Sequence, residues 1–231
     1  MEKPIISTTL SGLFIKNEPW EKAHILWFEE REVELKDKGK DLSAINEWRE
    51  LLKNDPEKEA KGYFKYVDLV MKKLYPEISE EERTRKARES YFKAVVTYIE
   101  LYPEIINREV VDYFISIKDK FKLSLITTNT KEALEEILEM ADLTDLFDIV
   151  EYSLPEEKDN KNLVFNRFIE KHGKPILYIG GDRKASYDYC REHNIKCVFA
   201  NFEDELPIED VENLNSFEEL KAKIEKINFK S

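Results

Sequence analysis

The sequence is poor in the residues that build disulfide frameworks and metal clusters. Only two cysteines occur in 231 residues, Cys190 and Cys197, and neither belongs to a CxxC or Cys/His grouping. The three histidines, His24, His172 and His193, show no metal-ligand spacing. We therefore expect two reduced thiols in a cytoplasmic protein, and we expect no metal centre built on histidine.

Long apolar runs and basic stretches are also missing. No run of about 18 apolar residues predicts a membrane span, and the first residues, MEKPIISTTLSG, lack the apolar centre of a signal peptide. The formal net charge is −12, and no basic stretch stands out against it. A general nucleic-acid binder needs a positive footprint. We therefore expect neither a nucleic acid nor a membrane as partner.

Glycine is scarce, with six residues, so each glycine in a turn is informative. Gly180 and Gly181 follow the apolar run 176–179, which is typical of a strand buried on both faces. Asp182 comes next, at the carboxyl end of that strand, where open parallel sheets bind ligands. A helical stretch and the β-rich run 197–200 follow, so this part of the chain predicts a βαβ unit.

The remaining pattern places a long helical insertion inside an alternating chain. Residues 4–9 predict a first strand, and from residue 18 to residue 101 the pattern is helical throughout. After Pro103, strands and helices alternate. We predict helices at 108–121, 131–140, 160–172, 184–193 and after the Ser216/Glu219 capping box, and strands at 123–126, 148–152, 176–179 and 197–200.

Alternating strands and helices imply a doubly wound parallel sheet, an α/β fold with a Rossmann-like core. We predict two domains, a core made of 1–17 and 102–231 and an all-helical domain made of 18–101. In the helix at 160–172, Leu163, Phe165, Phe168 and Ile169 are the expected core residues. Aromatic residues in the insertion are expected to pack in a helical bundle rather than to bind a ligand.

This order of elements resembles the haloacid dehalogenase (HAD) superfamily, whose members are mostly phosphohydrolases, with a helical cap inserted after the first core strand. The segment LSLITTNT resembles the second family motif, with Thr128 as the match just before Asn129. The segment YIGGD resembles the fourth motif, with Asp182 as its first acidic residue. For the third-motif lysine two candidates remain, Lys161, which is preferred, and Lys158.

The first family motif, DxD, is degenerate in this sequence. In the segment TLSGLFI, Thr9 stands in place of the nucleophilic aspartate, Ser11 stands in place of the acid/base aspartate, and Gly12 remains. Ser186 also replaces a second common acidic residue of the fourth motif. A protonated threonine hydroxyl is a poor nucleophile without a base beside it, and serine cannot act as a general acid or base near neutral pH.

The resemblance therefore implies the fold together with impaired chemistry. It implies a pseudo-phosphatase that binds phosphate or a phosphorylated small molecule through Thr128, Asn129, Lys161 or Lys158, and Gly12. Asp182 is left as a weak or vestigial metal ligand, so no tightly bound cofactor is expected. The alternative is an active phosphomonoesterase on a small phosphometabolite, which would require Mg²⁺. A third reading is a regulatory or structural protein that binds a protein partner through the helical cap.

Overall fold

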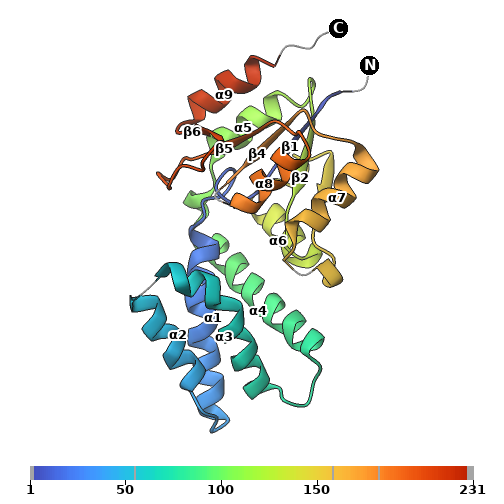
Figure 1. Ribbon diagram of the computed structural model, residues 1–231. Helices are drawn as coiled ribbons and strands as arrows, with labels where there is room; N and C mark the ends of the chain where they lie inside the picture. Colours follow the sequence, from blue (N-terminus) through green and yellow to red (C-terminus); the bar gives the residue numbers. More distant parts are fainter. Residues whose placement is uncertain (1–2, 55, 158, 182, 228–231) are drawn as a thin grey trace. The chain divides into compact units, whose positions relative to one another are not determined.

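The computed structural model of the chain describes residues 3–54, 56–157, 159–181 and 183–227, and the chain forms two compact units (Figure 1). One unit joins Met1–Glu18 to Ile99–Ser231, and the other is Pro19–Tyr98. The first unit carries the sheet, and the second is made of helices. Because compactness does not test independent folding, the division into domains 1–17 with 102–231 and 18–101 stays a prediction.

A parallel sheet forms the centre of the first unit, as the alternating sequence pattern predicts, and the predicted α/β class is confirmed. Each neighbouring pair of strands is parallel, and the strand order is β3-β2-β1-β4-β5-β6. The strands are β1 (Ile5–Thr8), β2 (Lys122–Ile126), β3 (Ile149–Glu151), β4 (Leu177–Gly180), β5 (Cys197–Ala200) and β6 (Glu212–Leu214). Ile6 of β1 lies in register with Leu123 of β2 and Leu177 of β4, and all three side chains are buried.

The strand order creates a topological switch point between β1 and β4. From β1 the chain adds β2 and then β3 on one side, and it returns to add β4, β5 and β6 on the other side. Connections that leave β1 and β4 therefore diverge, and a crevice is expected outside the carboxyl ends of these two strands. The residues that follow β1, β2 and β4 therefore meet at this edge of the sheet.

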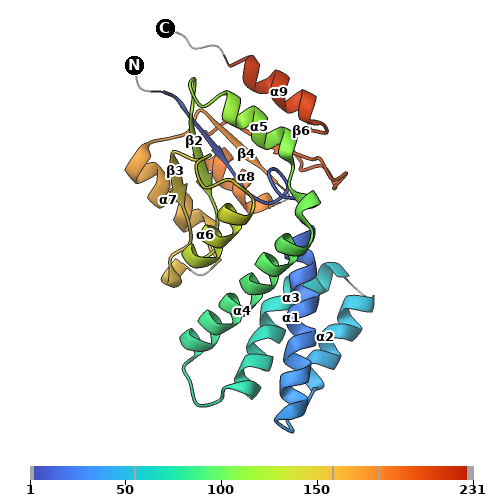
Figure 2. The same ribbon diagram turned by 180° about the vertical axis from the view of Figure 1, so that it is seen from behind.

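Helices cover both faces of the sheet (Figures 1 and 2). On one face lie α7 (Lys161–His172) and α8 (Lys184–Glu192), and on the other lie α5 (Arg108–Ser116), α6 (Lys131–Met140) and α9 (Phe217–Glu225). Short 3-10 turns, η1 (Pro103–Ile105) and η2 (Pro155–Glu157), precede α5 and α7. The α7/α8 face is held by a packed core in which Phe165, Phe168, Tyr178 and Tyr187 are fully buried.

Side-chain caps start several of these helices. The Thr130, Asn160 and Ser216 side chains accept hydrogen bonds from backbone N–H groups in the first turns of α6, α7 and α9. The predicted capping box at α9 is thus confirmed for Ser216. The Glu219 carboxylate, its other member, accepts instead from the Asn215 N–H, one residue earlier, at 2.7 Å.

The helical unit has a core of its own. It is built from α1 (Glu18–Asp37), α2 (Ser43–Asn54), α3 (Pro56–Leu74) and α4 (Glu80–Leu101). Phe28 and Trp48 stack with ring centroids 3.9 Å apart, and both are fully buried with Trp27. Aromatic residues of this insertion therefore pack in a bundle, as expected. Within the described ranges, no helix is both long enough and apolar enough to span a membrane.

Three details of the predicted elements are wrong. The helix predicted at 108–121 ends at Ser116, whose hydroxyl donates to the Tyr113 carbonyl at 2.6 Å, and hydrogen-bonded turns follow it. Leu163 was expected in the core, but it is 42% exposed and Val164 is buried in its place. The short edge strand β6 was not predicted, because its sequence, ENL, carries no β-branched residue.

Candidate functional site at the carboxyl edge of the sheet

Thr9 follows β1 directly and lies in the interior of this edge. Its backbone N–H donates to the Ile179 carbonyl of β4 at 3.1 Å, and the residue is only 8% exposed. The side-chain hydroxyl accepts a hydrogen bond from the Lys161 ammonium, with Nζ and Oγ1 3.4 Å apart. The residue in the place of the family nucleophile therefore contacts the preferred candidate for the third-motif lysine.

Lys161 is a buried cation at the start of α7. It is 4% exposed, and its Nζ also donates to the Tyr178 hydroxyl at 2.9 Å and lies over the ring of that residue. Burial raises the pKa of the Tyr178 hydroxyl, so this partner stays protonated at neutral pH. A buried ammonium is costly unless hydrogen bonds satisfy it. The sequence brings it here because Asn160 caps α7 and α7 packs on β4 side chains.

The loop after β1 turns sharply at Gly12. This glycine has a φ of +74°, and its N–H donates to the Ile15 carbonyl at 2.7 Å. Gly181, just after β4, lies against the same loop: a Cβ added to it would come within 2.5 Å of the Ser11 carbonyl oxygen. The two glycine-containing turns thus approach each other closely, and Ser11, the residue in the acid/base position, is half-buried between them.

Thr128 and Asn129 follow β2 at the same edge. The Thr128 hydroxyl accepts from the Arg183 guanidinium at 2.9 Å, so it contacts a cation. Asn129 is 5% exposed, and its carbonyl accepts from the Ser153 N–H at 3.1 Å. Among the described residues, the buried Nδ2 of Asn129 has no hydrogen-bond acceptor. A buried amide donor in this position is a reason to expect an additional acceptor, such as a bound anion or a water.

Arg183 is the charged residue that sequence reasoning missed. It lies before α8, where its guanidinium contacts both oxygens of the Asp159 carboxylate at 3.1 Å and donates to the Asp159 backbone carbonyl at 2.6 Å. With Thr128, the contact joins loops that follow β2 and β4 to the loop that precedes α7. The only sequence signal for it was a basic residue directly after the fourth-motif aspartate.

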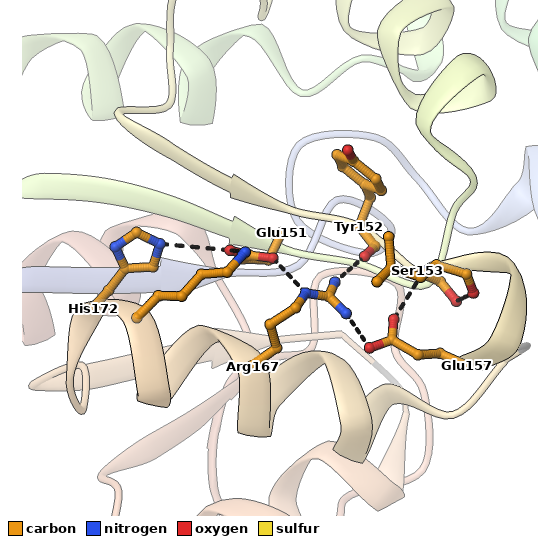
Figure 3. A network of polar contacts seen from close by, with 8 residues as sticks. Glu151, Tyr152, Ser153, Glu157, Arg167 and His172 are labelled. Atoms are coloured by element: carbon orange, nitrogen blue, oxygen red, sulfur yellow. Dashed lines mark hydrogen bonds and ion pairs between the residues drawn. The ribbon is translucent and has the colours of Figure 1, made fainter.

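A buried ionic network fixes the loop that precedes Lys161 (Figure 3). The Arg167 Nε donates to the Glu151 carboxylate of β3 at 2.9 Å, and the same guanidinium pairs with Glu157 and with the Tyr152 carbonyl. The Glu157 carboxylate accepts from the Leu154 N–H at 2.8 Å. Arg167 therefore ties α7 to the end of β3 and to the loop between them.

Two of the predicted site residues, Lys158 and Asp182, lie outside the described residues. The contacts of Lys161 support it as the third-motif lysine, but the choice against Lys158 stays a prediction. In the part of the chain that the structure describes, no three His, Cys, Asp or Glu side chains lie together as a metal site. The ordinary carboxylate ligands of magnesium are thus not assembled from the described residues around Thr9 and Ser11.

Comparison with known proteins finds solved structures of the same fold. No protein-family model matches the sequence, and no curated protein matches it. Solved structures match over nearly the whole chain. A HAD phosphatase from Thermococcus onnurineus is 15% identical with a TM-score of 0.59, covering 96% of this chain and 98% of that one. A 2-haloacid dehalogenase from Pseudomonas syringae is 14% identical with a TM-score of 0.56, covering 97% and 99%.

A third structure of the same kind was determined with a metal. It is the candidate HAD-hydrolase YfnB from Bacillus subtilis, bound to magnesium, which is 12% identical with a TM-score of 0.57 and covers 97% of this chain and 100% of that one. These likenesses show that the chain adopts the fold of HAD-like hydrolases, as the sequence resemblance implied. At such identities they show the fold alone.

Proposed function

We propose that this chain uses a HAD-like hydrolase fold to bind a phosphate group without hydrolysing it efficiently. The ligand is inorganic phosphate or a small phosphorylated molecule, bound at the carboxyl edge beside β1, β2 and β4. The observation that carries the proposal is the contact between Thr9 and the buried Lys161 ammonium, 3.4 Å from Nζ to Oγ1. It combines a cation suited to an anion with a hydroxyl in the position of the nucleophile.

The chemistry of Thr9 supports poor turnover. Its hydroxyl accepts a hydrogen bond from an ammonium, which is an acid and not a base, so Lys161 does not activate it for attack. Ser11 has no group that exchanges a proton near pH 7. Loss of a nucleophile alone costs on the order of a millionfold in turnover in a serine protease. Efficient hydrolysis by this set of side chains is therefore not expected.

The donors at the edge support binding of an anion. Lys161 supplies a charge in a desolvated position, where hydrogen bonds to phosphate are strong. Thr128 and Asn129 add a hydroxyl and a buried amide on the neighbouring strand end. Replacing two aspartates by neutral side chains also removes repulsion that a bound magnesium ion would otherwise offset. We therefore propose that phosphate binds here without metal.

Calorimetric titration with inorganic phosphate in the presence of a chelator tests the proposal. We expect binding to the unmodified chain, and a loss of at least about tenfold in affinity in Lys161→Met, because a charged hydrogen-bond donor is removed. Lys174→Met is the matched control. The Lys174 side chain is exposed, and among the described residues its one hydrogen bond is to the His193 carbonyl. Circular dichroism must show that both variants remain folded.

An assay on a panel of phosphomonoesters with Mg²⁺ separates the proposal from its alternative. We expect no robust turnover. Magnesium-dependent turnover that disappears in Thr9→Ala would establish an active phosphomonoesterase with an unusual nucleophile. Absence of phosphate binding in the folded, unmodified chain would overturn the proposal altogether.

A protein-binding role is the second candidate, and an observation on α1 favours it. Leu26 and Val33 are seven residues apart, so they share a face of the helix, and they are 39% and 58% exposed. Two side chains do not amount to a large apolar patch, and this candidate therefore ranks below phosphate binding. It is the reading to adopt if calorimetry detects no phosphate binding.

A further inference from the structure

The Arg183 guanidinium holds a carboxylate in the geometry in which arginine holds phosphate. Its two terminal nitrogens each contact one carboxylate oxygen of Asp159 at 3.1 Å, so the contact is bidentate. Planar guanidinium groups bind carboxylate and phosphate oxygens in this same arrangement. The Asp159 side chain is therefore a chemical equivalent of an anionic ligand at Arg183.

The position of this pair places it at the candidate phosphate site. The nitrogen Nη1 that contacts Asp159 also donates to the Thr128 hydroxyl at 2.9 Å. Thr128 follows β2, Arg183 follows β4, and both strands flank β1, which leads to Thr9. Asp159 lies two residues before Lys161, the cation that contacts Thr9. The Asp159 carboxylate thus pairs with a cation that also contacts the Thr128 hydroxyl, at the carboxyl edge of the same sheet.

The exposure of the pair indicates that the contact can be exchanged. The Arg183 and Asp159 side chains are 36% and 45% exposed, respectively. Ion pairs at such positions are weak, because water and salt screen them. By contrast, the Glu151 and Arg167 side chains in the network under the loop are 8% and 17% exposed. The buried network can hold the loop in place while the exposed pair opens.

We propose that Arg183 and Thr128 form a further anion-binding pair, and that the Asp159 carboxylate occupies it until an arriving phosphate group displaces it. This inference rests on the proposed phosphate-binding function. It adds a regulation of affinity: the chain carries its own competing anion, and the measured affinity for phosphate is the intrinsic affinity reduced by the cost of releasing Asp159.

A double-mutant cycle with inorganic phosphate tests the proposal at constant ionic strength. Asp159→Asn removes the charge and keeps the size and the backbone carbonyl contact with Arg183. We expect it to tighten phosphate binding about fivefold, which corresponds to about 1 kcal/mol. Arg183→Gln should weaken binding, and Asp159→Asn should give no gain in the Arg183→Gln background.

A matched control separates local competition from the general effect of net charge. Asp112→Asn neutralises an exposed carboxylate on α5 and should change the affinity by less than twofold. A gain from Asp159→Asn that persists in Arg183→Gln, or that Asp112→Asn reproduces, overturns the proposal. So does an unchanged affinity in both Asp159→Asn and Arg183→Gln.

The results also distinguish this inference from the proposed function. Phosphate binding that depends on Lys161 but is unchanged by substitution of Asp159 and of Arg183 overturns this inference alone. Binding that appears only in Asp159→Asn supports the inference about Asp159 but overturns the proposed function, because the unmodified chain then does not bind phosphate. No binding in the unmodified chain or in folded Asp159→Asn overturns both the inference and the proposed function.

Discussion

At the residue scale, the site depends on one close approach between two backbones. Gly181 packs so tightly on the loop after β1 that a Cβ would lie 2.5 Å from the Ser11 carbonyl oxygen. The obstacle is backbone, which cannot rotate away as a side chain would. Any larger residue at 181 must therefore displace either the end of β4 or the loop that carries Ser11 and Gly12.

We predict that Gly181→Ala lowers the free energy of unfolding by about 2 kcal/mol and weakens phosphate binding together with it. Chemical denaturation and calorimetry measure the two effects. Gly39→Ala is a useful comparison: its φ of +61° strains an alanine, yet a Cβ there meets nothing within 4 Å. That variant should lose stability while it keeps its phosphate affinity. Unchanged stability and affinity in Gly181→Ala would mean that the loop yields freely.

The sequence predicted part of this site through strand ends and motif positions. Thr9, Thr128 and Gly12 could be placed because they match motif positions in the resemblance to the HAD superfamily, and residues that follow parallel strands meet at one edge of the sheet. The Arg183–Asp159 pair could not be predicted, because single charges in loops follow no periodicity. The roles of all these residues in binding stay predictions.

At the scale of elements, Arg167 joins α7 to the edge strand β3. Burial alone would raise the pKa of the Glu151 carboxyl, but hydrogen bonds from Lys171 and Arg167 outweigh it and hold that pKa below its usual value of 4.5. His172 lies 3.5 Å from the same carboxylate. The depressed pKa means that the charged form of Glu151 stabilises the folded chain.

This linkage has a definite direction with pH. The stabilisation from Glu151 is fully present above pH 4.5, the value for the unfolded chain, and is lost as pH falls through the lower folded pKa. We predict that Glu151→Gln costs about 1 to 2 kcal/mol at pH 7 and that the difference from the unmodified chain shrinks in acid. Urea denaturation at a series of pH values measures it. Glu156→Gln, at an exposed neighbouring position, is the control for the loss of one carboxylate. A difference for Glu151→Gln that does not change with pH would contradict the argument.

Most elements could be predicted from apolar periodicity, and the exceptions have physical causes. The helix 131–140 and the strand 197–200 were predicted with the bounds that the structure gives. The predicted helix at 108–121 was too long, because the Ser116 hydroxyl binds a backbone carbonyl of the last turn and so competes with the helical hydrogen bonds there. The strand β6 was not predicted because its extended conformation depends on pairing with β5 and not on the propensities of its own three residues.

At the scale of the whole molecule, two hydrophobic cores are separate in sequence. The helical unit packs around Trp27, Phe28 and Trp48, while the sheet unit packs around residues such as Phe168 and Tyr178. A substitution in one core is therefore expected to affect mainly the unit in which it lies. This expectation bears directly on the predicted division into two domains.

We predict that Trp48→Ala destabilises the helical unit by about 3 to 5 kcal/mol, because it removes a fully buried, stacked ring. Native-state hydrogen exchange should then speed up at amides of α2 such as Ile45 and remain slow in β1 and β4. Phe168→Ala should give the reverse pattern. An equal loss of protection in both units after either substitution would show that the chain unfolds as one cooperative body.

The two edge strands of the described sheet also bear on the solubility of the folded chain. β3 and β6 contain only three residues each, and each carries a glutamate, Glu151 in β3 and Glu212 in β6. Long, uncharged edge strands recruit strands of other molecules through their unpaired backbone groups. Short edges that carry charge, with Glu151 held inward by Arg167 and Glu212 paired with Lys223, offer little to such a strand. The sheet is thereby protected against edge-to-edge aggregation at both ends.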